Sequence, residues 1–81
     1  MNMRVPRDVF ASELIKVLER YGYLVIRQTG SHIRLSKTIG DSEHNITVPN
    51  HKPIKIGILQ SIVKDVCSAN GVPISEIYAQ L

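Results

Sequence analysis

The sequence predicts an α+β fold in which one helix is followed by three antiparallel strands, a second helix and a short last helix. Apolar residues recur at helical spacing near both ends of the chain, whereas the middle alternates between apolar and polar residues as strands do. Short turns join the strands. We therefore expect a three-stranded antiparallel sheet with the helices on one face and the other face open.

Length and composition suit a single domain over residues 1–81. The 81 residues are 43% hydrophobic and 21% charged, which allows one modest core. The single cysteine, Cys67, excludes an intramolecular disulfide, and its apolar surroundings suggest a buried thiol in a reducing compartment. The start resembles no signal peptide, and no run approaches the roughly 20 apolar residues of a membrane span. We expect a cytoplasmic protein.

The first helix is expected to follow an N-terminal arm. Residues 1–11 read as the arm, because Pro6 and Asp8 oppose regular structure. Ser12 is a plausible N-cap for the helix. Gly22 should end the helix as a left-handed cap.

Three strands are expected over residues 23–28, 31–36 and 44–48. The Thr29-Gly30 pair marks a hairpin turn between the first two, and residues 37–43 read as a polar loop. The inward phase of each element predicts the core. Its expected members are Leu14, Leu18, Leu24, Ile26, Ile33, Leu35, Ile46, Val48, Leu59, Ile62 and Val63.

The C-terminal part should hold two helices after a loop over 49–53, which carries two prolines. The longer helix begins near Lys55 and ends at Asn70-Gly71, and the short one spans 73–81. Gly57 falls in the first turn, although glycine costs about 1 kcal/mol in a helix interior. A close backbone approach or a bound anion would explain it.

The open face of the sheet should carry His32. Alternation turns His32, Arg34 and Ser36 away from the core, with Asn45 and Thr47 beside them. Imidazole titrates near neutral pH, so His32 is a candidate acid or base. The competing interpretation is a solvated surface histidine, since no second acid or base accompanies it at a fixed spacing.

Charge is concentrated in the middle of the chain. Residues 27–55 hold five basic and two acidic residues, whereas the remainder holds five of each, so the net charge of +3 arises in the middle. Such a distribution is typical of an anion-binding face, for which RNA or DNA is the usual partner. The alternative is a solvated face whose charges only maintain solubility.

Three short runs in this order resemble the HicA family of mRNA interferase toxins. They are RQTGSH at 27–32, TVP at 47–49 and GILQSI at 57–62, and the resemblance spans about residues 12–81. It implies a fold similar to the double-stranded RNA-binding domain and metal-independent RNA cleavage by His32, without a cofactor. It also implies a HicB-type antitoxin that covers this site. Ile58 departs from the threonine that is common in the family.

Five further residues are expected to bind RNA beside the catalytic His32. Cleavage by the RNA's own 2′-hydroxyl needs a proton acceptor, a proton donor and cations for the developing charge. Arg34 and Arg27 would stabilise the phosphate, and Lys52 and Lys55 would make sequence-independent backbone contacts. The full expected RNA-binding set is Arg27, Ser31, Arg34, Lys52 and Lys55.

The sequence leaves two other roles open for the same surface. One is a non-catalytic RNA-binding module, and the other is an inactive subunit that only binds an antitoxin. His44 and His51 are alternative participants, placed at loop edges. The three histidines lack the paired spacing typical of a metal site, so none is predicted.

Overall fold

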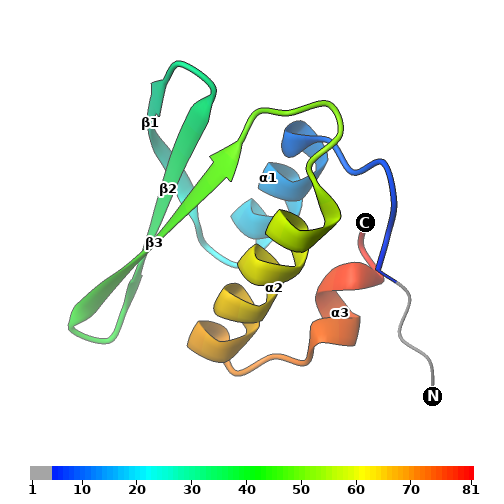
Figure 1. The fold of residues 1–81 in the computed structure, drawn as a ribbon. Coiled ribbons are helices and arrows are strands. Elements are labelled where there is room, and N and C mark those ends of the chain that lie inside the picture. Colours follow the sequence, from blue (N-terminus) through cyan, green and yellow to red (C-terminus); the bar gives the residue numbers. More distant parts are fainter. Residues whose placement is uncertain (1–4) are drawn as a thin grey trace.

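The computed structural model describes residues 5–81 and has the predicted α+β fold (Figure 1). The sheet lies on one side and the helices on the other. Part of the expected N-terminal arm, residues 1–4, lies outside the described residues. In chain order the elements are α1 (Ala11–Arg20), β1 (Leu24–Thr29), β2 (His32–Ile39), β3 (Ser42–Pro49), α2 (Ile56–Asn70) and α3 (Ile74–Tyr78).

Both ends of α1 are fixed by local hydrogen bonds. The N-cap is Phe10 rather than the expected Ser12, because the Phe10 N–H donates to the Glu13 carboxylate at 3.0 Å. At the other end Gly22 has a φ of 95° and its N–H donates to the Glu19 carbonyl at 3.0 Å. A left-handed glycine of this kind was predicted, and it turns the chain directly into β1.

The sheet has the order β1-β2-β3, and both pairs are antiparallel. The expected loop over 37–43 is wrong, because β2 and β3 continue pairing up to Ile39 opposite Ser42. Only Gly40 and Asp41 form the turn. A two-residue turn that opens with glycine suits a tight hairpin, so the ladder extends right up to it.

The core lies between the sheet and the helices. Ile33, Leu35, Ile46 and Val48 supply the sheet's side of it, as the alternation predicted. From the helices come Leu14, Val17, Leu18, Leu59, Ile62, Val63, Val66 and Cys67, with Ile77 from α3 and Val9, Tyr23 and Ile54 from the connections.

Strand β1 departs from its predicted packing. Leu24 and Ile26 were expected in the core, yet they are 67% and 57% exposed. Leu24 pairs with Ser36, on the face opposite that of the buried Leu35, so β1 has the reverse of the predicted phase and Leu24 points away from the helices. The pairing register then shifts between Val25 and Arg27, so Ile26 is the extra residue of a bulge next to Arg27. Val25 does face the helices, but it is still 46% exposed because the helices approach the sheet most closely at β3 (Figure 1). Tyr23, the residue before β1, points inward instead and is fully buried in the core.

The long C-terminal helix ends where the sequence predicted. Gly71 caps α2 with a φ of 66°. The last helix is shorter than expected, because α3 ends at Tyr78 and not at residue 81. The N-terminal segment is tied to the chain before α2, since the Ile54 N–H donates to the Val9 carbonyl at 2.8 Å. No helix of residues 5–81 is both long and apolar enough to cross a membrane.

Candidate RNA-binding face

Strand pairing gathers polar and charged side chains on the outer face of the sheet. Arg34 lies opposite Thr47, and Ser36 lies opposite Asn45. Residues directly opposite one another in an antiparallel pair share a face. His32 is exposed on the same side, while its neighbour Ile33 is buried, so the predicted register of β2 is confirmed.

The bulge in β1 adds a second cation beside Arg34. Arg27 pairs with Arg34, and Thr29 pairs with His32. The side chains of Arg27, His32 and Arg34 therefore lie at one end of the outer face. We call these three residues the cationic end. Arg27 is exposed and Arg34 is half-buried, which leaves their guanidinium groups available to an anion.

A backbone contact joins the turn before His32 to the loop after β3. The Asn50 N–H donates to the Ser31 carbonyl at 2.6 Å. The predicted site residue Ser31 is exposed in this turn, and its carbonyl connects the turn to the loop after β3. The same contact places the start of the loop over 50–55 next to the cationic end. His51 and Lys52 follow Asn50 directly, and both are exposed.

Only some of the predicted RNA-binding residues lie close together in the structure. Arg27 and Arg34 are strand partners, and Ser31 adjoins His32 in the chain. Lys52 is near them only because Asn50, two residues before it, is hydrogen-bonded to Ser31. Lys55 lies at the far end of that loop, where it is the N-cap residue of α2. It is exposed beside the helix start, a position that suits a phosphate contact.

His44 lies on the opposite side of the sheet from His32. Its Nδ1 is 2.6 Å from the Tyr23 hydroxyl, and its Nε2 is 3.0 Å from Asp65 Oδ1 on α2. Asn70 Nδ2 donates to the same hydroxyl at 2.9 Å, and Lys37 Nζ donates to Asn70 Oδ1. This cluster fastens the C-terminal half of α2 to the sheet, so His44 is a structural residue.

Sequence reasoning missed this cluster, although one signal pointed to it. His44 has the same inward phase as Ile46 and Val48 in β3, and an inward polar side chain needs a partner. Burial raises the pKa of the Tyr23 hydroxyl, since the ionised form would lose its hydration. The hydroxyl therefore stays protonated, and it can donate to His44 Nδ1 while accepting from Asn70.

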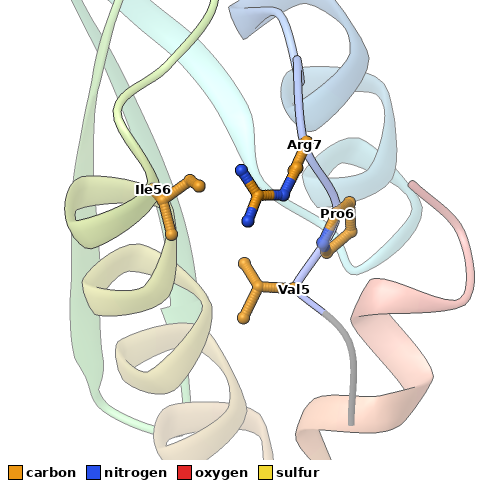
Figure 2. Close-up of a pocket in the computed structure, with 4 residues that line it drawn as sticks. All are labelled: Val5, Pro6, Arg7 and Ile56. Atoms are coloured by element: carbon orange, nitrogen blue, oxygen red, sulfur yellow. The ribbon is translucent and has the colours of Figure 1, made fainter.

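The described N-terminal residues form an open pocket against the start of α2. Val5, Pro6, Arg7 and Ile56 line it, with the Arg7 guanidinium between Val5 and Ile56 (Figure 2). None of these residues was predicted to form a site. Among residues 5–81, no three His, Cys, Asp or Glu side chains are grouped so as to hold a metal ion.

A family model described as the HicA toxin of bacterial toxin–antitoxin systems matches residues 11–66. The match runs from the start of α1 into α2 and includes the whole sheet. It confirms the resemblance found in the sequence. No curated protein and no solved structure matches the chain.

Proposed function

Because the chain belongs to the HicA toxin family, we propose that it is a cytoplasmic endoribonuclease that cleaves mRNA at the cationic end of its sheet. One observation supports this site above any other. An exposed histidine lies beside two arginines that share its face, on a sheet face that the helices leave open. A proton-transfer group and cations for a phosphate are what RNA cleavage requires.

The proposed reaction uses the RNA's own 2′-hydroxyl as the nucleophile. Its oxygen attacks the adjacent phosphorus, its proton leaves, and the bond from phosphorus to the 5′-oxygen breaks. The products are a 2′,3′-cyclic phosphate and a 5′-hydroxyl. His32 acts as the base that removes the first proton or as the acid that supplies the second. Arg27 and Arg34 stabilise the negative charge on the phosphate oxygens.

The remaining predicted residues hold the RNA backbone in place. The Ser31 backbone is held next to His32 by its bond to Asn50, and the exposed Ser31 hydroxyl contacts a phosphate or sugar oxygen. Lys52 and Lys55 extend the positive charge along the loop toward α2. Such contacts position RNA without reading its sequence.

The test is incubation of purified protein with mixed RNA, beside the variants His32→Ala and His51→Ala. We expect cleavage with and without chelator, ending in a cyclic phosphate, and no cleavage by His32→Ala. The variant should unfold within about 1 kcal/mol of the parent, because His32 is exposed. His51→Ala is the matched control, an exposed histidine in the adjoining loop, and it should retain cleavage.

Other results of this experiment would indicate a different function for the protein or a different mechanism. Undiminished cleavage by His32→Ala would reject the catalytic assignment. Binding of RNA without cleavage by the parent would support the RNA-binding module instead. Substrate RNA with a 2′-O-methyl group at the cleaved position should resist cutting, and cutting of that RNA would reject the 2′-hydroxyl mechanism.

We also propose that an antitoxin of the HicB type covers the cationic end and so excludes RNA. A complementary acidic surface would be attracted to Arg27 and Arg34. Charge reversal by Arg34→Glu should weaken binding of RNA and of antitoxin together. A complex in which RNA still binds normally would mean that the antitoxin docks elsewhere.

A further inference from the structure

The outer face of the sheet has an apolar end as well as a cationic one. Leu24 and Ile26 of β1 are more than half exposed and lie two residues apart. They line a shallow hollow, whose full lining is Gly22, Leu24, Ile26, Ser36, Lys37 and Thr38. Aliphatic side chains gathered in a hollow on the surface are typical of a binding site for another molecule.

The apolar end is continuous with the cationic end. Leu24 pairs with Ser36, which shares its outward phase with Arg34 two residues away. The bulge then places Ile26 directly before Arg27. A partner that fills the hollow would therefore extend naturally over Arg27 and Arg34.

We propose that the apolar end is the anchoring surface for the antitoxin, and that RNA does not use it. The partner is a protein segment that inserts aliphatic side chains beside Leu24 and Ile26 and places acidic residues over Arg27 and Arg34. The inference rests on the proposed function. The two ends then have different roles. The cationic end binds the RNA substrate, and the apolar end provides most of the affinity for the antitoxin.

The chemistry of the hollow favours a protein over RNA. No aromatic side chain lines it, so a base has nothing to stack on. Its one cationic residue, Lys37, directs its ammonium group to Asn70 on α2. A phosphate would find hydroxyls from Ser36 and Thr38 but no guanidinium or ammonium group aimed at it.

Charge also argues against a second copy of this chain as the occupant. The chain carries a net charge of +3. A second copy would bring the same excess of positive charge, so it gains nothing from a contact with Arg27 and Arg34. A partner with acidic residues gains from the same contact.

The experiment uses the double variant Leu24→Ser/Ile26→Ser and a purified antitoxin of the HicB type that binds the parent. We expect antitoxin binding to weaken at least tenfold by calorimetry, while the rate of RNA cleavage stays that of the parent. The antitoxin should then fail to inhibit RNA cleavage by the variant at concentrations that fully inhibit cleavage by the parent. Both side chains are exposed, so the fold should persist, and a thermal unfolding scan checks this.

Val25→Ser is the matched control. Val25 lies in the same strand and is 46% exposed, but it pairs with Leu35 and so shares the helix-facing side. It should leave antitoxin affinity unchanged. Equal weakening by Val25→Ser would show that β1 as a whole, and not the hollow, binds the antitoxin.

Three other outcomes would overturn the proposal. They are unchanged antitoxin affinity in the double variant, weakened RNA binding in it, and self-association of the parent that the double variant abolishes without effect on the antitoxin. The nuclease and anchoring proposals fail separately. If the parent does not cleave RNA, the proposed enzymatic function is wrong, yet the calorimetry still measures whether Leu24 and Ile26 hold the antitoxin.

Discussion

Arg27 on β1 lies directly opposite Arg34 on β2. Like charges in such a pair destabilise a sheet by about 0.2–1 kcal/mol. We therefore expect Arg27→Thr to raise the free energy of unfolding by that amount while it weakens RNA binding. Denaturant unfolding and RNA titration measure the two effects. Lys64→Gln, which removes an exposed charge from α2, should produce neither. Lower stability in Arg27→Thr would mean that Arg27 makes packing contacts that outweigh the repulsion.

RNA affinity should fall steeply as salt rises, because the cationic end, Lys52 and Lys55 act through phosphates. The slope of log affinity against log salt reports the number of phosphate contacts. We expect Arg34→Gln to reduce that slope by about 1, and Lys64→Gln to leave it unchanged. Affinity that is flat between low and physiological salt would contradict the phosphate contacts.

The Tyr23–His44 contact gives a prediction for stability near neutral pH. Tyr23→Phe removes the hydroxyl that His44 and Asn70 share, and all three lie between the sheet and α2. The cost should be about 1–3 kcal/mol, since polar partners there lose a hydrogen bond. Denaturant unfolding measures it. A cost near zero would mean that water replaces the hydroxyl freely.

The same hydroxyl makes stability fall at alkaline pH. Burial raises the pKa of Tyr23 above its ordinary value of 10.0. Above pH 10 the unfolded chain loses a proton that the folded chain keeps, so the free energy of unfolding decreases as pH rises. Below pH 10 the contribution is fully present. Other groups with raised pKa values, Tyr21, Tyr78 and Cys67, add to the loss. Tyr23→Phe should therefore show a shallower alkaline decline than the parent, and an identical slope would contradict this assignment.

Gly57→Ala should stabilise the protein by up to about 1 kcal/mol, because alanine is the better helix former. A Cβ at position 57 would meet nothing within 4 Å, so no close backbone approach explains this glycine. Thermal unfolding of the variant measures the gain. A loss of stability would show that the first turn of α2 needs the freedom of glycine.

The sequence by itself determined much of the fold and the direction in which His32 points. The alternation around Ile33 and Leu35 turned His32 and Arg34 outward, since successive residues of a strand face opposite sides. Gly22 and Gly71 ended the helices through local backbone geometry. These features depend on neighbours in the chain, and local patterns are sufficient to predict them.

Only the tertiary structure decided on which face Leu24 and Ile26 of β1 lie and which side chains surround His44. Leu24 and Ile26 are apolar, as core residues are, but the pairing of β1 with β2 turns Leu24 to the outer face, and Ile26 is the exposed extra residue of a bulge. His44 meets Asp65, 21 residues away in the chain, because α2 packs over that end of the sheet, and it meets Tyr23, also 21 residues away, because strand pairing brings the start of β1 toward β3. A periodic pattern says which side chains share a face. It does not say which of the two faces another element covers, because coverage depends on how distant segments pack.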